Sequence, residues 1–531
     1  MGKNQVVSHW RAGMRVHTWI LLSTAVALQA CGGGDGDGFN QPPDLFGNPP
    51  VQDPGPQPTA LDDQVRALID AQGLTGDAST GRTLPAIGDP LPQLGMRLFF
   101  SKALGGEFDS ACVSCHHPAL GGADNLSLSV GIGAVDPDLV GLGRGDATGV
   151  PNVPRNAPTT FNIALWDSSL FWDSRVASLG AEPGQNGAAS GISTPDSGLN
   201  VIDPDAGANL TTAQARFPVT SVEEMRGDLE LGQPNDVLRA HLEARIGDYG
   251  VGAGEIGMAT WLAEFQDAFR SAETAENLIT FDNIVAAIAE YERSQVFVNN
   301  AWKEYVQGDL TAINDQAKEG AVLFFTPVDQ GGAGCVTCHS GDFFTDEQHH
   351  AVGAPQFGPG KGNGPGGTAD FGRENISGNA ADRFRFRTPT LLNVSETAPY
   401  MHTGAYATLQ DVVAHYSNPR QAVNNFFAAG GWCQLPQFDA VANCDTLYPN
   451  AENDSNAALG KVDTERAAND PLALPQMNLD QVERDRLVAF LLTLTDPCLQ
   501  SRDCVSDWVP DPADAADTHQ LNAVDINGNP L

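Results

Sequence analysis

The chain has 531 residues, 41% of them hydrophobic, which suits two or three domains rather than one. Its 66 acidic residues outnumber its 29 basic residues, and the net charge of −37 repels nucleic acid and anionic lipid, which excludes a nucleic-acid-binding protein. No run of about 20 apolar residues follows the N-terminal segment, so no later membrane-spanning helix is predicted. The acidity attracts a basic partner if it is concentrated on one face, and otherwise serves solubility.

Residues 1–30 have the pattern of an export signal. Basic residues precede a short apolar stretch, 19–28, and residues 28–31 read Leu-Gln-Ala-Cys, as before a lipid-modified cysteine. Residues 31–60 are rich in Gly, Pro and Asp and predict a flexible tether. We therefore expect a periplasmic protein with a lipid anchor at Cys31; a simple cleaved signal is the alternative.

Apolar residues recur at helical spacing in eight segments. The predicted helices are 61–72, 92–100, 237–249, 256–272, 280–296, 315–325, 409–416 and 479–494. Thr280 is a good N-cap, and Asn478 with Gln481 has the pattern of a capping box before the last helix. Between the helices, 121–154 and 417–477 lack periodicity and are predicted to be irregular, and strand patterns are scarce.

Nine cysteines divide into Cys31, four in two Cys-x-x-Cys-His motifs, and four others. The last four lie in close pairs, Cys433 with Cys444 and Cys498 with Cys504, and suggest two local disulfides in an oxidising compartment. Four cysteines allow three pairings, so the connectivity stays open at this point.

Two Cys-x-x-Cys-His motifs predict two covalently attached c-type haems, because the thiols add to the haem vinyl groups and the adjacent His binds the iron. They are Cys112-Val-Ser-Cys115-His116 and Cys335-Val-Thr-Cys338-His339. A structural zinc site would not require His directly after both pairs. The sequence thus predicts a mainly α fold with two c-type cytochrome domains, 61–305 and 306–498, large irregular loops, and an irregular tail, 499–531.

The first haem lacks the usual candidates for a second axial ligand. No His lies between His117 and His241, and the loop 125–155 contains no Met. The iron bound by His116 is therefore expected to be open on one side, as peroxide binding requires.

Five segments resemble those of bacterial di-haem cytochrome c peroxidases and the related MauG enzymes. In order, within roughly 85–495, they are 156–162 (Asn-Ala-Pro-Thr-Thr-Phe-Asn), 171–175 (Phe-Trp-Asp-Ser-Arg), 218–225 (Pro-Val-Thr-Ser-Val-Glu-Glu-Met), 386–393 (Phe-Arg-Thr-Pro-Thr-Leu-Leu-Asn) and 397–404 (Thr-Ala-Pro-Tyr-Met-His-Thr-Gly). The resemblance implies an oxidoreductase with peroxide as acceptor.

The resemblance also implies roles for two residues near the first haem. Glu224 would be the distal carboxylate that takes a proton from peroxide and returns it to the leaving oxygen; Glu223 is the competing assignment, and a solvated acid the plain alternative. Trp172 would carry electrons between the haems, although it could equally be a core aromatic residue.

An interdomain calcium ion is a further implication of the resemblance. Asn156 would contribute its side-chain oxygen, and Thr397 and Pro399 their carbonyl oxygens, with water completing the shell. A simple turn around Pro399 is the alternative.

Thr408-Leu409 also resembles the family, and here the second haem site departs from the simple peroxidases, which have Met eight residues after this Thr. Here that residue is Tyr416, as in MauG-type enzymes, and its helical spacing with Leu409 and Val413 places it on the inner face. Tyr416 is thus the expected second axial ligand, which should lower the haem potential. A hydrogen-bonded core Tyr, with His415, Met401 or His402 as the real ligand, is the alternative.

Several functions fit these residues. The first is reduction of H2O2 at the N-terminal haem, with electrons passed through the C-terminal haem from a small periplasmic cytochrome or cupredoxin. The second is a MauG-like oxidation of residues of a partner protein. A non-enzymatic electron carrier and a di-haem oxygenase are further alternatives. The simple peroxidases also carry a His before the Asn-Ala-Pro segment that leaves the first haem on reduction; its absence here predicts reaction with peroxide without prior reduction.

Overall fold

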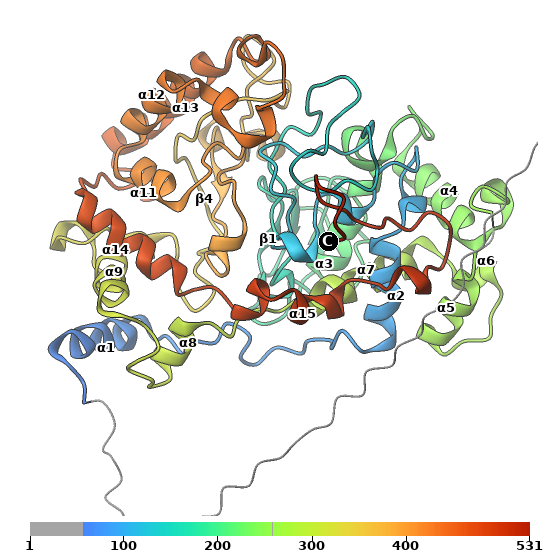
Figure 1. The fold of residues 1–531 in the computed structure, drawn as a ribbon, viewed down its shortest axis with the longest axis horizontal. Helices are drawn as coiled ribbons and strands as arrows, with labels where there is room; N and C mark the ends of the chain where they lie inside the picture. Colours follow the sequence, from blue (N-terminus) through green and yellow to red (C-terminus); the bar gives the residue numbers. More distant parts are fainter. Residues whose placement is uncertain (1–56, 258) are drawn as a thin grey trace, which may run out of the picture. The chain divides into compact units, whose positions relative to one another are not determined.

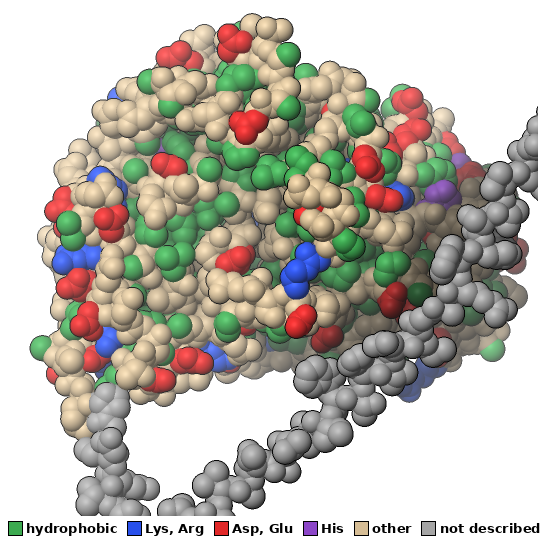
Figure 2. Space-filling model, viewed as in Figure 1, with side chains coloured by type: hydrophobic (Ala, Val, Ile, Leu, Met, Phe, Trp, Pro, Cys, Tyr) green, Lys and Arg blue, Asp and Glu red, His purple; other side chains and the backbone are tan. Residues whose placement is uncertain are grey.

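The structure is a computed structural model that describes residues 57–257 and 259–531. The predicted export signal, Cys31 and nearly all of the tether lie outside the described residues. Within the described part, no helix combines the length and apolar character needed to cross a membrane. Acidic side chains are scattered over the face shown in Figure 2 rather than gathered in one patch.

The described chain is mainly helical, with two small antiparallel sheets (Figure 1). The helices are α1 (Ala60–Gln72), α2 (Pro90–Phe99), α3 (Leu210–Ala215), α4 (Asn235–Gly247), α5 (Trp261–Phe269), α6 (Ala275–Leu278), α7 (Phe281–Ser294), α8 (Ala301–Val306), α9 (Asp315–Phe325), α10 (Glu374–Ser377), α11 (Leu409–Ser417), α12 (Pro419–Ala428), α13 (Ala451–Ala468), α14 (Gln481–Leu492) and α15 (Arg502–Val505). The sheets are β1 (Ser169–Leu170), β2 (Val176–Ser178) and β3 (Ile192–Ser193) in that order, and β4 (His349–His350) paired with β5 (Phe386–Arg387).

Most predicted helices are confirmed, and Thr280 caps α7 by accepting a hydrogen bond from the N–H of Asn283. Two details are wrong. Helix α5 begins at Trp261 rather than 256. The capping box of α14 is formed by Asp480 and Glu483 instead of Asn478 and Gln481, since the Asp480 carboxylate accepts from the N–H of Glu483 at 2.9 Å and the Glu483 carboxylate accepts from the N–H of Asp480 at 2.8 Å.

The prediction that 417–477 is irregular is also wrong, because this segment contains α12 and α13. The 18 residues of α13 are mostly Ala and polar side chains, which favour a helix by intrinsic propensity without marking a wide apolar stripe. Its buried apolar residues include Leu459 and Val462, too few for periodicity to reveal the helix.

Each Cys-x-x-Cys-His motif follows a helix that packs closely against a later helix. Helix α2 contacts α7 through Gly95, where a Cβ would lie 1.9 Å from the carbonyl oxygen of Ala287. Helix α9 contacts α14 through Gly320, where a Cβ would lie 2.0 Å from the carbonyl oxygen of Arg486. Only glycine permits either approach, so the two haem motifs share the same local helix packing.

Two hydrophobic clusters surround the two motifs. The first draws on α2, α4, α5 and α7, and the second on α1, α8, α9 and α14, which lie on opposite sides of Figure 1. The two ends of the described chain cross over between the clusters. Val65 and Ile69 of α1, near the N-terminal end, pack in the second cluster, and Leu521 of the C-terminal tail packs in the first. The tail is anchored there by a hydrogen bond from the indole of Trp261 to Asp517 at 2.8 Å.

Both expected disulfides are present, pairing Cys433 with Cys444 and Cys498 with Cys504. The first links two short helical turns, Gly431–Gln434 and Cys444–Thr446, which lie between α12 and α13. The four cysteines of the haem motifs form no disulfide and remain available for attachment.

Candidate functional site

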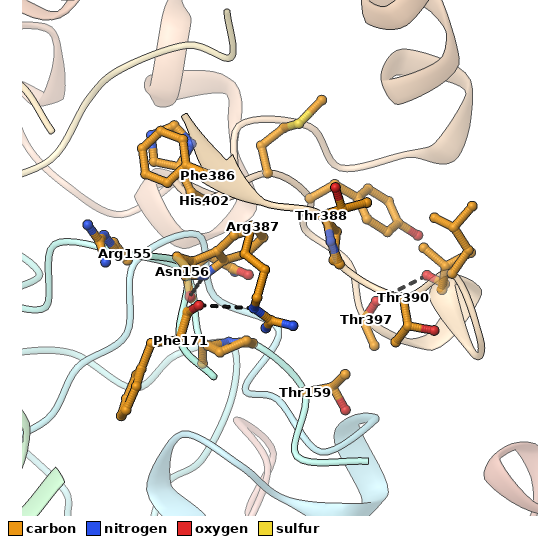
Figure 3. A pocket seen from close by; sticks show the side chains of 18 of the residues that line it. Arg155, Asn156, Thr159, Phe171, Phe386, Arg387, Thr388, Thr390, Thr397 and His402 are labelled. Atoms are coloured by element: carbon orange, nitrogen blue, oxygen red, sulfur yellow. Dashed lines mark hydrogen bonds between the residues drawn. The ribbon is translucent and has the colours of Figure 1, made fainter. Parts of the chain in front are cut away.

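Both Cys-x-x-Cys-His motifs line the same interior cavity, of about 340 Å³. Figure 3 shows part of the lining of this cavity. In each motif the two cysteines lie on or beside a single 3-10 turn, Cys112–Ser114 or Cys335–Thr337, which brings both thiols to the same side. Burial raises the pKa of Cys115 and of Cys335 to about 12, so both thiols are neutral.

The histidines of the motifs are held in the form that binds iron. Nδ1 of His116 lies 3.2 Å from the carbonyl oxygen of Gly122, and Nδ1 of His339 lies 3.1 Å from that of Phe344. A carbonyl only accepts, so Nδ1 carries the hydrogen and Nε2 keeps its lone pair. Burial lowers the pKa of both imidazoles to about 4, which keeps them neutral. The residues present therefore fit two covalently attached haems.

Glu224 and Glu223 have different surroundings. Both lie in a π-helical turn, Val222–Arg226, but only Glu224 lines the cavity, whereas Glu223 is exposed and accepts a hydrogen bond from Ser221. Gly131 backs this turn so closely that a Cβ would lie 2.2 Å from the carbonyl oxygen of Glu223. Burial raises the pKa of Glu224, although Arg175 opposes the shift. The geometry favours Glu224 as the acid at the first site.

Trp172 lies along the wall of the cavity that both motifs share. Its indole N–H donates to the carbonyl oxygen of Asn156 at 3.0 Å, and its own carbonyl accepts from the N–H of Arg387 at 2.9 Å. The Arg387 guanidinium in turn donates to the carbonyl of Phe171 (Figure 3) and lies 3.4 Å from the ring centre of Trp166. Trp172 is therefore fixed between the loop that contains Asn156 and β5.

Tyr416 on α11 lines the cavity beside the second motif, as expected. Burial and the nearby Cys338 and Cys335 raise the pKa of its phenol above the usual range. Its hydroxyl forms no hydrogen bond with the described residues, whereas His415 uses both ring nitrogens, accepting from the hydroxyl of Tyr406 at 2.9 Å and donating to the carbonyl of Val352 at 2.8 Å. Both ring nitrogens of His415 are therefore occupied, which favours Tyr416 over His415.

The other two alternatives, Met401 and His402, also line the cavity. His402 stacks on Phe386 with ring centres 3.9 Å apart (Figure 3), and its Nε2 accepts from the side-chain amide of Gln356 at 3.0 Å. That nitrogen is therefore occupied, which favours Tyr416 over His402.

The three residues expected to hold calcium, Asn156, Thr397 and Pro399, all line the same cavity. The Asn156 side-chain amide donates to the carbonyl of Leu126 at 2.8 Å, which leaves its oxygen available for a cation.

Periodicity and motif spacing missed a buried charge network at one end of the cavity. Arg155 donates to both carboxylate oxygens of Asp370 at 2.6 and 2.9 Å and to Asp173 at 2.6 Å. Lys361 and Arg175 line the cavity beside it. Asp370 is 215 residues from Arg155, so no local pattern could have paired them.

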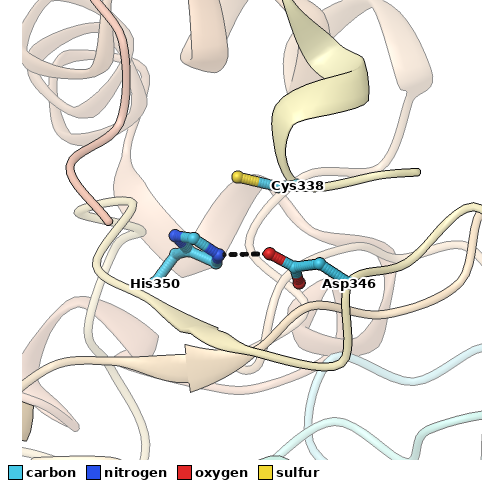
Figure 4. A group of neighbouring side chains, drawn as sticks. All are labelled: Cys338, Asp346 and His350. Carbon is cyan, nitrogen blue, oxygen red and sulfur yellow. Dashed lines mark hydrogen bonds and ion pairs between the residues drawn. The ribbon is translucent and has the colours of Figure 1, made fainter. Parts of the chain in front are cut away.

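Cys338, Asp346 and His350 also lie together (Figure 4), with one ligand atom of each within 4.8 Å of the others. His350 lies 2.9 Å from the carbonyl of Leu472 through Nδ1 and 2.8 Å from Asp346 through Nε2. Burial opposes its charge, but Asp346 outweighs burial and raises the pKa of His350 to about 10. Both nitrogens then carry hydrogen, and this group fits a buried ion pair beside the haem motif rather than a metal site.

Comparison with known proteins agrees with this arrangement. Residues 90–311 match the family described as di-haem cytochrome c peroxidase. The chain is 28% identical over 323 residues to the methylamine utilization protein MauG of Methylorubrum extorquens, covering 61% of this chain and 67% of that protein. It is 28% identical over 363 residues to the cytochrome c551 peroxidase of Pseudomonas aeruginosa, covering 68% and 81%.

Among solved structures, a MauG-like protein associated with microbial copper homeostasis has the same fold, with a TM-score of 0.50 and 22% identity over 81% of this chain and 97% of that one. The family match and both relatives agree with the paired haem motifs of the cavity. These comparisons support the di-haem cytochrome c peroxidase and MauG family for this chain, and an oxidoreductase that uses peroxide.

Proposed function

We propose that the chain reduces H2O2 at the haem bound by His116, with electrons that arrive through the haem bound by His339. The observation that carries this proposal is the asymmetry of one cavity, in which Glu224 lies within electrostatic reach of Cys115 in the first motif and Tyr416 within reach of Cys335 and Cys338 in the second. An acid beside an open iron suits peroxide chemistry, whereas an iron closed by a tyrosine suits electron transfer.

When bound through His116 and His339, the haems would supply an open iron site for peroxide and the redox centres for its two-electron reduction. Glu224 would accept a proton from one oxygen of H2O2 and deliver it to the other oxygen, which would leave as water. Burial raises the pKa of Glu224, which makes its carboxylate a stronger base toward the peroxide proton. Trp172, held between Asn156 and β5, provides an aromatic side chain along the path between the two sites.

A MauG-like oxidation of a partner protein is the second candidate, and Tyr416 is the observation that favours it. An anionic oxygen ligand would lower the reduction potential of the second haem. A lower potential suits a haem that stores an oxidising equivalent better than one that only relays electrons. A pure electron carrier fits less well, because it has no use for Glu224. Because the loop 125–155 has no His, the oxidised protein is expected to react with peroxide without prior reduction.

The remaining expectations belong to the same proposal. Calcium bound by Asn156, Thr397 and Pro399 would join the two halves of the chain, 61–305 and 306–498. We place the protein in the periplasm, anchored by lipid at Cys31. Its reductant would be a small cytochrome or cupredoxin.

Steady-state assays separate the two candidates. Peroxide turnover with reduced cytochrome c that is lost in Glu224→Gln and kept in the exposed neighbour Glu223→Gln supports the peroxidase. Poor turnover with cytochrome c, together with peroxide-dependent oxidation of a co-purifying protein, supports the second candidate. An oxidised protein with two low-spin haems that ignores peroxide would refute both.

A further inference from the structure

The charges around Glu224 do not all cancel within the protein. Arg155 is paired with Asp370 and Asp173, each at 2.6 Å. Arg175 lies 3.4 Å from Asp173, and its guanidinium lies 3.7 Å from the ring centre of Phe171. These two arginines and two carboxylates balance one another.

Lys361 and Glu224 take no part in these ion pairs. Both side chains line the cavity, and each influences the charge of the other. Among the described residues neither has an oppositely charged partner within 4.0 Å, so the two groups face the same space without touching. Burial and the two arginines lower the pKa of Lys361, as expected for an ammonium that lacks a counter-ion.

The backbone of Lys361 is held firmly. Its N–H donates to the carbonyl of Ala369 at 3.1 Å, and at the preceding Gly360 a Cβ would lie 2.0 Å from the carbonyl oxygen of Thr368. The Thr368 hydroxyl donates to Asp454 of α13 at 2.7 Å. The helix that sequence periodicity failed to reveal thus supports the loop that brings Lys361 to the cavity.

We propose that Lys361 is a positioning residue that holds the peroxide anion at the first haem while Glu224 holds its proton. The inference rests on the proposed function. H2O2 gives one proton to the Glu224 carboxylate, leaving HOO⁻ and a neutral carboxylic acid, and no electron moves in this step. The ammonium of Lys361, a residue that is exposed to solvent and whose backbone is held by Ala369, stabilises the new negative charge by electrostatic attraction.

A haem carboxylate could offer Lys361 the same negative charge. The test therefore compares an anionic with a neutral ligand of the first haem. In the oxidised holoprotein at pH 7, azide and imidazole are titrated by absorbance in wild type, Lys361→Gln and Lys361→Arg. Lys303→Gln is the matched control, since Lys303 on α8 is paired with Asp77 at 2.7 Å in the second cluster.

We expect Lys361→Gln to weaken azide binding about tenfold and to change imidazole binding less than twofold, with Lys361→Arg close to wild type. The second-order rate constant with peroxide should fall by a similar factor. Unchanged azide binding would overturn the inference. So would equal weakening of both ligands together with a changed haem midpoint potential, since that pattern indicates pairing with a haem carboxylate. Selective loss of azide binding in a protein that proves inert to peroxide would uphold the anion site and reject only the proposed function.

Discussion

Glu292 on α7 is a buried carboxyl group whose ionisation should make the protein less stable as pH rises. Its side chain is 3% exposed, and Oε2 has no hydrogen-bond partner among the described residues. Burial alone raises its pKa from 4.5 to about 8. In the unfolded chain the group releases its proton near its ordinary pKa, whereas the folded protein retains the proton until about pH 8.

The sign and size of the effect follow from this difference. The folded state binds more protons between the two pKa values, so the contribution is fully present below the unfolded pKa and is lost as pH rises through the folded one. Each pH unit in the window costs about 1.4 kcal/mol, and the loss between pH 5 and pH 8 is on the order of 3 kcal/mol. Glu292→Gln removes the titration, because the amide has the same cost of burial at every pH.

The assay is urea unfolding of the holoprotein at pH 5, 6, 7 and 8. The stability of Glu292→Gln relative to wild type should rise by on the order of 3 kcal/mol across this range. Glu290→Gln is the control, since Glu290 lies on the same helix but is paired with Arg293. A difference between Glu292→Gln and wild type that is the same at every pH would refute the reasoning.

Three further predictions concern the site and the packing. The rate constant of wild type with peroxide should rise with pH through the raised pKa of Glu224, as the carboxylate forms. Glu224→Gln should react more slowly by a factor of about 10² to 10⁴, with a rate constant that does not change with pH. A stopped-flow pH series that is equally steep in both proteins would contradict this. Gly320→Ala should lower the free energy of unfolding by about 1 to 3 kcal/mol, because the new Cβ would meet the Arg486 carbonyl. Gly460→Ala, in the open interior of α13, should raise it by up to about 1 kcal/mol. Equal shifts in melting temperature would argue against the observed contact. Chelation with EGTA should slow peroxide turnover and added calcium should restore it, whereas Asn156→Ala should show no response to either, as followed by absorbance.

The sequence predicted local structure well where a motif or an amphipathic stripe marks it. The limits of α9 and the cap of α7 follow from residues that are neighbours in the chain. Helix α13 was missed because its helical tendency comes from Ala and polar side chains, and its role in supporting the loop before Asp370 depends on contacts across roughly 90 residues. Periodicity cannot report such contacts.

The candidate site divides in the same way. Cys-x-x-Cys-His is a local chemical pattern, so the haem cysteines and both histidines were accessible to sequence reasoning. The choice between Glu224 and Glu223 required the π-helical turn, which directs only one of two adjacent acids into the cavity. Lys361 could not be found at all, because a lysine in a glycine-rich loop is ordinarily a solvated surface residue.

Unequal axial ligation of the two haems is the central claim, and EPR of the oxidised protein tests it most directly. Wild type should show one high-spin haem, open beside Glu224, and one low-spin haem. Tyr416→Met should change the low-spin signal and leave the high-spin signal unaltered, while Tyr448→Phe, in a separate aromatic cluster, should change neither. Two low-spin haems in wild type, or a low-spin signal indifferent to Tyr416→Met, would contradict the claim.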